Sequence, residues 1–121
     1  MLRCGTDIIE ISRIKKAIET NDKFKEKIFT DSEILYSESK KTSKYEAYAA
    51  RFAAKEAVFK AISGKVDTKE IMWKSIEVIN DNCGKPSIKL SINIPELKYI
   101  DISLSHCKEY AVANVIAEFK D

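Results

Sequence analysis

One stretch of helix-forming residues constrains the fold of this chain more than any other feature. Residues 45–63 contain no Gly or Pro, and nearly every one of them favours a helix. At about 100° per residue, the large apolar side chains of this stretch form one stripe, and alanines cover most of the remainder. The stripe consists of Tyr48, Phe52, Phe59 and Ile62. We therefore expect a helix that is buried on more than one side.

Four charged residues interrupt this apolar surface, and the segment has no broad polar face to hold them. They are Arg51, Lys55, Glu56 and Lys60. Burying a charge without a partner costs several kcal/mol. The four side chains are therefore expected either to pair with one another or to line a site that a charged ligand fills.

The length and composition indicate one ordinary globular domain. With 121 residues the chain has the size of a single domain, which we place at residues 1–121. The sequence is 45% hydrophobic and 33% charged, which is typical of a folded protein and not of a disordered chain. The net charge is only +2, so attraction of the whole molecule to nucleic acid is not indicated.

Several features predict a cytoplasmic protein with no membrane segment. No apolar run approaches the roughly 18 residues of a membrane-spanning helix, and the N-terminus shows no export signal. The three scattered cysteines, Cys4, Cys83 and Cys107, suit a reducing compartment better than a disulfide framework. With one histidine and no CxxC spacing, a zinc site is not indicated.

The first part of the chain predicts one strand and three short helices. Residues 2–11 are rich in β-branched side chains and predict a strand. Ser12 is the expected N-cap of a helix over residues 13–20, and residues 24–28 predict a second helix. Thr30 and Glu33 have the spacing of a capping box, which predicts a third helix to about Ser39. Residues 37–44 are polar and predict a loop.

The part of the chain after the long helix predicts strands. Residues 72–79 predict a strand that includes Trp73, and residues 81–86 predict a turn. Strict alternation from Ile88 to Ile94 predicts a half-buried strand that Pro95 ends, followed by a short turn or helix at residues 96–99. Residues 100–105 and 110–119 predict two more strands. This order predicts an α+β fold in which an antiparallel run of about four strands packs on the long helix.

Two carboxylates on separate elements are candidates for a metal site. Asp7 lies inside the first predicted strand, where it either accepts backbone donors or binds a cation. Glu56 precedes Lys60 by four residues, the order that favours a local salt bridge. Alternatively this pair faces a ligand, because Ala49 and Ala53 on the same flank leave room. Mg²⁺ commonly takes one or two carboxylates together with water and substrate phosphates, so Asp7 and Glu56 would suffice.

Three other features suit a phosphate-bearing ligand or an acidic partner. The turn at Gly84, Lys85 and Pro86 is either only a hairpin turn or a set of free backbone N–H groups beside a lysine. His106, the only histidine, is either structural or a phosphate contact. The basic face of the first helix, which includes Arg13, is either solvated or docks an acidic protein.

Four ordered motifs resemble those of bacterial holo-acyl-carrier-protein synthases, in the 4′-phosphopantetheinyl transferase family. Residues 5–14, GTDIIEISRI, resemble the family's N-terminal signature, and residues 51–61, RFAAKEAVFKA, resemble the second. Residues 103–111, SLSHCKEYA, lie at the place of the third. Residues 82–86 are similar to the family's turn before a strand. The match runs from residue 2 nearly to the end of the chain.

The resemblance implies a Mg²⁺-dependent transferase of fatty acid biosynthesis. In this family a serine hydroxyl of apo acyl carrier protein attacks the β-phosphorus of coenzyme A, and adenosine 3′,5′-bisphosphate leaves. By motif position Asp7 and Glu56 would bind Mg²⁺, and Glu56 and Lys60 would be the catalytic residues, with Lys60 stabilising the diphosphate charge. Either Glu56 or a metal-bound water would take the serine proton.

The resemblance also implies coenzyme contacts, a carrier-protein contact and an oligomer. Besides Lys60, the expected coenzyme A contacts are Gly84, Lys85, Pro86 and His106. Arg13 matches a position that meets the acidic carrier protein. The family is typically a homotrimer with the coenzyme at subunit interfaces, which would also cover the apolar outer face of the long helix.

Some features depart from the family pattern or leave alternatives open. Arg3 stands where the family has the first glycine of a Gly-x-Gly pair, and Cys107 follows the histidine where Thr or Ser is common. Arg51 and Lys55 are expected to be either coenzyme contacts or inter-subunit pairs. One alternative function is a non-catalytic module whose basic helix holds an acidic protein or nucleic acid. Another is a transferase for carrier domains of polyketide or peptide synthetases, although the short length favours the fatty-acid type.

Overall fold

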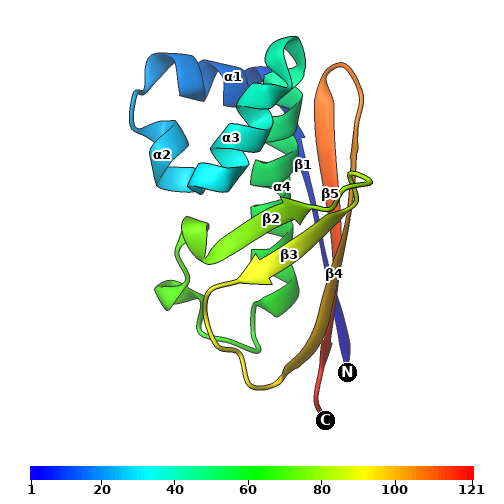
Figure 1. The fold of residues 1–121 in the computed structure, drawn as a ribbon. Helices are drawn as coiled ribbons and strands as arrows, with labels where there is room; N and C mark the ends of the chain where they lie inside the picture. Colours follow the sequence, from blue (N-terminus) through cyan, green and yellow to red (C-terminus); the bar gives the residue numbers. More distant parts are fainter.

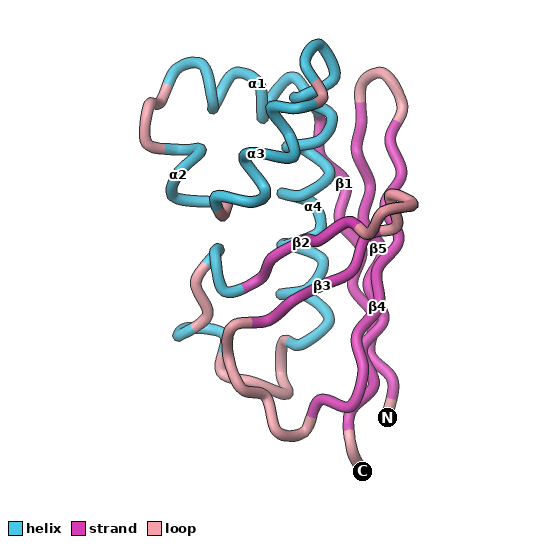
Figure 2. Tube along the Cα trace, viewed as in Figure 1, coloured by secondary structure: helices cyan, strands magenta, loops and turns pink.

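The long helix lies at the centre of the molecule. A computed structural model describes residues 1–121, and helix α4 (Lys44–Ile62) runs along the inner face of a sheet with a smaller hairpin beside it (Figure 1). The other helices, α1 (Ile11–Thr20), α2 (Phe24–Ile28) and α3 (Asp31–Ser39), gather at one end of the molecule (Figure 2). The strands are β1 (Leu2–Glu10), β2 (Ile76–Asn80), β3 (Pro86–Leu90), β4 (Leu97–His106) and β5 (Tyr110–Phe119).

The strands form two antiparallel sheets. Three of them make one sheet in the order β1-β5-β4, and β2 and β3 form a separate hairpin. The N-terminal strand pairs along its whole length with β5, from Leu2 opposite Glu118 to Glu10 opposite Tyr110. The α+β class with antiparallel strands is therefore confirmed. The single run of about four strands is wrong, because β3 does not pair with β4, and the third strand of the main sheet is β1.

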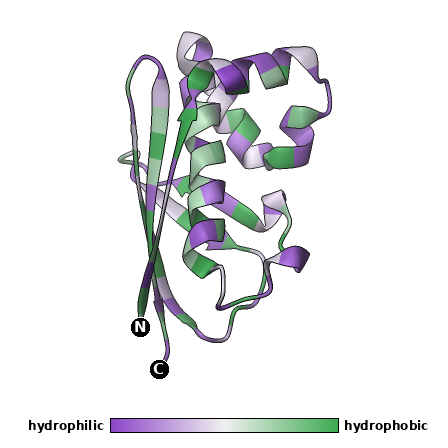
Figure 3. Ribbon diagram, turned by 180° about the vertical axis from the view of Figure 1, so that it is seen from behind, coloured by the Kyte–Doolittle hydropathy of each residue, from purple (hydrophilic) through white to green (hydrophobic).

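The inner face of the three-stranded sheet is built for a close approach of α4. Alternate residues of β5 point inward and are buried, and most of them are small: Ala111, Ala113, Val115, Ala117 and Phe119. Seen from behind, polar and apolar residues alternate along these strands (Figure 3). On β1, a Cβ added at Gly5 would lie 2.0 Å from the carbonyl oxygen of Ala57 on α4. Only glycine fits at this crossing, because the clash is with backbone.

The core surrounds α4 on several sides, as its composition predicts. One buried cluster joins α4 to the sheet and to the hairpin, through residues such as Ala57, Ile76 and Val115. The side that carries Phe52 and Phe59 is covered by Trp73, whose ring centre lies 5.2 and 5.6 Å from theirs. Trp73 of the same chain thus covers part of this side, and the expectation that a neighbouring subunit covers the half-buried Phe52 and Phe59 stays a prediction.

Local sequence signals predicted the start of α3 correctly and the start of α1 incorrectly. The capping box is confirmed, because the Thr30 side chain accepts from the Glu33 N–H and the Glu33 carboxylate accepts from the Thr30 N–H. The predicted cap at Ser12 is wrong. α1 begins two residues earlier than predicted, at Ile11, with Glu10 as an N-cap that makes no side-chain bond, because the N–H of Ile11 is already bonded to the carbonyl of Glu109. The loop predicted at residues 37–44 holds the end of α3 and a 3₁₀ turn, Lys41–Ser43.

Three strand boundaries differ from the prediction because pairing, and not local pattern, sets them. Trp73 lies in a 3₁₀ turn, Trp73–Ser75, and β2 begins only at Ile76. β3 ends at Leu90, which is paired with the first residue of β2, so the alternation up to Ile94 continues without a partner strand. The turn or helix expected at residues 96–99 is instead the start of β4, because Leu97 pairs with Phe119. None of the helices combines the length and apolar character needed to cross a bilayer.

Candidate functional site

The close crossing of β1 and α4 brings Asp7 to Lys60. Asp7 lies two residues from Gly5 and therefore shares the inward face of β1. Lys60 Nζ donates to Asp7 Oδ1 at 3.2 Å and to the Thr6 carbonyl at 2.9 Å. Lys60 thus pairs with a carboxylate of another element, and the local salt bridge to Glu56 is not the contact it makes.

The electrostatics of this corner are unbalanced toward negative charge. Partial burial raises the pKa of the Glu56 carboxyl, and the nearby Asp7 carboxylate raises it further, while Lys60 offsets only part of the effect. Two carboxylates and one lysine leave a place for a cation. No group of three or more His, Cys, Asp or Glu side chains that could hold a metal is present. Asp7 and Glu56 could hold an ion such as Mg²⁺, which commonly takes only one or two carboxylates.

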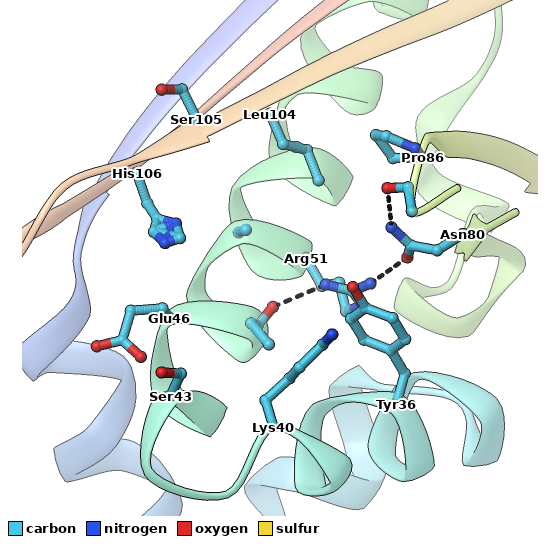
Figure 4. Close-up of a pocket in the computed structure, with 13 residues that line it drawn as sticks. Tyr36, Lys40, Ser43, Glu46, Arg51, Asn80, Pro86, Leu104, Ser105 and His106 are labelled. Carbon is cyan, nitrogen blue, oxygen red and sulfur yellow. Dashed lines mark hydrogen bonds between the residues drawn. The ribbon is translucent and has the colours of Figure 1, made fainter. Parts of the chain in front are cut away.

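The open space beside α4 does not lie next to Ala49 and Ala53, where the sequence predicted it. Ala49 and Ala53 are fully buried in the core and leave no room for a ligand. A cavity of about 430 Å³ lies instead beside the N-terminal half of the helix, bounded by α3, the β2–β3 turn and the end of β4 (Figure 4). Its lining includes three of the predicted coenzyme contacts, Gly84, Pro86 and His106.

The remaining predicted residues lie outside this cavity. Lys85 is exposed in the turn between Gly84 and Pro86 and does not line it. Asp7, Glu56 and Lys60 are also absent from its walls. Arg13 is exposed on α1.

Arg51 is a buried cation of the cavity wall, which Lys40 also lines. It is 3% exposed, and its guanidinium lies 4.0 Å from the centre of the Tyr36 ring. Its Nη1 donates to the Ala47 carbonyl at 3.2 Å, its Nη2 donates to Asn80 Oδ1, and its Nε has no partner. Burial lowers the pKa of Arg51. No carboxylate pairs with it, so an anion in the cavity would supply the missing counter-charge.

Polar side chains connect Arg51 to the turn that carries the predicted contacts. The Asn80 amide accepts from Arg51 and donates to the Gly84 carbonyl at 3.0 Å. Lys40 lies 4.7 Å from the centre of the Tyr36 ring, on the same wall (Figure 4). The sequence singled out neither Tyr36 nor Asn80, because nothing local distinguishes them and only the fold brings them to Arg51.

Lys55 has a different role from the two expected for it. It is fully buried and pairs with Glu33 at 2.8 Å, a residue that is also fully buried. It has no exposed surface and does not line the cavity described above, so in this chain it is neither a coenzyme contact nor an inter-subunit pair.

The chain therefore presents two groups of candidate residues in separate places. Arg51 and Glu56 are five positions apart on α4, which turns them about 140° from each other around the helix axis. The cavity lies beside the first half of α4, whereas Glu56 and Lys60 lie on its second half. One copy of the chain does not bring the carboxylates into the cavity.

Comparison with known proteins agrees with the motifs. Residues 3–115 match the model of the 4′-phosphopantetheinyl transferase superfamily. The chain belongs to this superfamily. A holo-[acyl-carrier-protein] synthase of Ruminiclostridium cellulolyticum is 48% identical over 124 residues, covering 97% of this chain and 92% of the relative. The predicted family and enzyme class are confirmed, which overturns the alternative of a non-catalytic module.

Solved structures of superfamily members share the fold. A holo-(acyl-carrier-protein) synthase from Bacillus anthracis, in complex with CoA (3′,5′-ADP), is 41% identical with a TM-score of 0.81, covering 98% of this chain and 96% of that one. The Helicobacter pylori holo-[acyl-carrier-protein] synthase, in complex with coenzyme A, is 30% identical with a TM-score of 0.79, covering 95% of this chain and 99% of that one.

Proposed function

We propose that residues 1–121 form one domain that transfers 4′-phosphopantetheine from coenzyme A to a serine of apo acyl carrier protein. The observation that carries this proposal is the corner of Asp7, Glu56 and Lys60, where β1 crosses α4. Phosphoryl-type transfer needs charge neutralisation and alignment more than covalent help from the protein. The named relatives, which are holo-acyl-carrier-protein synthases, support the same activity. We further propose that it serves fatty acid biosynthesis in the cytoplasm.

In the proposed reaction the serine oxygen bonds to the β-phosphorus of coenzyme A. The bond from this phosphorus to the bridging oxygen breaks, and adenosine 3′,5′-bisphosphate leaves with that oxygen. Lys60 stabilises the negative charge that grows on the leaving phosphate. The Glu56 carboxylate, which is also a proposed Mg²⁺ ligand, or a water held beside it accepts the serine proton.

Asp7 and Glu56 are the proposed ligands of Mg²⁺. They fit this ion because Glu56 lies in a corner with a net negative charge, where its ionised form is disfavoured. When bound, Mg²⁺ neutralises diphosphate charge and polarises the phosphoryl oxygens. The backbones of β1 and α4 hold Asp7 and Glu56 in place.

The cavity is proposed to hold the nucleotide end of coenzyme A. Arg51 supplies a cation, the turn at Gly84 and Pro86 supplies a wall, and His106 lies at the end of β4. Lys85 extends from the same turn toward the diphosphate. Arg13, on the exposed face of α1, is proposed to meet the acidic carrier protein.

A homotrimer would unite the two groups of residues. Because the cavity and the carboxylates lie on different parts of α4, we propose that coenzyme A lies between subunits, with the cavity of one copy beside Asp7 and Glu56 of another. The exposed apolar residues on the outer sheet face, Ile8 and Ile116, offer a surface for association.

Mass spectrometry of the carrier protein tests the proposed function. Incubation of the chain with apo acyl carrier protein, coenzyme A and Mg²⁺ should add the mass of one phosphopantetheine to the carrier protein. EDTA should abolish this gain. No gain with Mg²⁺, or an equal gain in EDTA, would contradict the proposal. Apo carrier domains of polyketide and peptide synthetases, tested in parallel, define the range of acceptors.

A further inference from the structure

The buried ion pair of Lys55 and Glu33 has no part in the reaction proposed above. Both side chains have no exposed surface, and Lys55 Nζ lies 2.8 Å from Glu33 Oε1. Taking two charges out of water costs about as much as their attraction returns, so apolar pairs of similar volume are often as stable or more stable. Stability therefore does not explain why a lysine stands inside the apolar core of α4.

The polar atoms of this pair are directed at fixed backbone partners. Besides Glu33, Lys55 Nζ donates to the carbonyls of Trp73, at 3.0 Å, and Ile76. An ammonium has three donors, and here all three have an acceptor. Glu33 accepts from the N–H of Thr30 at 2.9 Å and from the N–H of Val78 at 2.8 Å. The pair thus joins the start of α3, the middle of α4 and the strand β2.

The strand held by this pair leads directly into the cavity wall. Val78 is two residues before Asn80, the last residue of β2, and Asn80 bonds to Arg51 and to the Gly84 carbonyl. Arg51 lies one helical turn before Lys55, so α4 contacts β2 at two successive positions. Lys55 bonds to the backbone at the start of the strand, and Arg51 bonds to the side chain at its end.

We propose that the Glu33–Lys55 pair is a positioning device for the coenzyme cavity. It fixes the β2–β3 hairpin against α4 so that Asn80 meets Arg51 and the Gly84 turn forms the opposite wall. Hydrogen bonds of fixed direction suit this task, because an apolar contact would allow the strand to slide along the helix. The inference rests on the proposed function, in which this cavity binds coenzyme A.

The test compares Lys55→Met with wild type in coenzyme A binding and in turnover. Calorimetry should show coenzyme A affinity weakened roughly tenfold, a typical coupling within one hydrogen-bond network. The KM for coenzyme A should rise in parallel, while kcat at saturating coenzyme A stays within about twofold, because the carboxylate corner is untouched. Lys25→Met is the matched control. It breaks a partly exposed ion pair between Lys25 of α2 and Glu38 of α3, and should leave coenzyme A affinity unchanged.

Asn80→Ala shows whether the pair acts through the hairpin. This change should also weaken coenzyme A binding. In the Asn80→Ala, Lys55→Met double variant, the total fold-loss of affinity should be much smaller than the product of the two single losses. If the effects multiply, the pair does not act through Asn80 and the proposal is wrong. Normal coenzyme A affinity in Lys55→Met, or a loss of kcat with KM unchanged, would overturn it as well.

A second variant covers the case in which Lys55→Met does not fold. Glu33→Gln combined with Lys55→Met removes both charges of this buried pair, and the amide can still accept from Val78. This double variant should fold and show the same weakened coenzyme A affinity; wild-type affinity would overturn the proposal. A wild-type chain that does not bind coenzyme A would instead overturn the proposed function, and this inference with it.

Discussion

Among the acidic side chains, Glu56 combines partial burial, a neighbouring carboxylate and no ion pair of its own. The same lysine that would pair with it along the helix pairs with Asp7 instead. Burial first, and then the Asp7 charge, raise the pKa of Glu56. A residue in this state is poorly placed for stability and well placed to bind a cation or accept a proton.

Glu56→Gln is therefore expected to stabilise the fold while removing activity. A carboxyl whose folded-state pKa is raised above its ordinary 4.5 contributes stability at lower pH and loses it as pH rises through the folded value. The glutamine variant lacks this loss. Its melting temperature should therefore rise relative to that of wild type as pH increases from 4.5 through the folded-state pKa of Glu56, and the difference should persist at neutral pH. Transfer activity should fall by about 100-fold or more. Mg²⁺ should raise the melting temperature of wild type only.

Glu77→Gln is the control, because the pKa of the Glu77 carboxyl is lowered and not raised. The Thr30 hydroxyl donates to Glu77 and lowers the pKa of its carboxyl, with a further contribution from Ser32. The stability that Glu77 contributes is present above its ordinary pKa and lost as pH falls through the folded value. Its glutamine variant should therefore be less stable than wild type at neutral pH and keep its activity. A destabilised Glu56→Gln at neutral pH would contradict the assignment.

At the scale of elements, the contact of β1 with α4 determines the geometry of the corner. Gly5 and Asp7 share one face of β1, so any change in the distance of this strand from α4 moves Asp7 relative to Glu56. A methyl group at Gly5 cannot be accommodated by side-chain movement, since the atoms it meets are the carbonyl of Ala57 and the N–H of Ala61.

Gly5→Ala should therefore separate β1 from α4 and impair both stability and transfer. We expect a loss of about 1–3 kcal/mol, as for other overpacked sites, and a fall in transfer activity with a higher Mg²⁺ requirement. Gly64→Ala is the control: its φ of +82° strains the backbone, but nothing lies within 4 Å of the added Cβ. It should cost about 1 kcal/mol and leave the Mg²⁺ requirement unchanged. Equal Mg²⁺ requirements in both variants would contradict the role of Gly5.

Local sequence patterns predicted the helices and strands themselves better than they predicted which of these elements pack together. The long helix, the capping box at Thr30 and the last strand all follow from spacing within a short segment. The pairing of β1 with β5 joins residues 100 or more positions apart, and no local signal encodes it. The same limit applies to the site. The motifs singled out His106 and Glu56 as candidate site residues. The partners of Lys55 and Arg51 come from α3 and β2, which only the folded chain brings to α4.

At the scale of the whole molecule, the proposal of a second copy rests on the separate positions of the cavity and the carboxylates along α4. If the chain forms the proposed homotrimer, it should sediment at three times its mass of 13.8 kDa. Ile116→Arg on the outer sheet face, where Ile116 is 44% exposed, should yield a folded monomer with little activity. A monomeric wild-type protein with full activity would contradict the shared site.

Mixed trimers decide whether the half-sites come from different copies. Glu56→Gln removes the carboxylate corner and Arg51→Met removes the buried cation of the cavity, so each variant alone should lose about 100-fold or more of its activity. When both are co-expressed, random assembly in a closed ring places an intact cavity beside an intact corner at about a quarter of the interfaces. The mixture should then regain about a quarter of wild-type activity. If mixed trimers form, as shown by native mass spectrometry, but stay inactive, cavity and carboxylates must act within one copy.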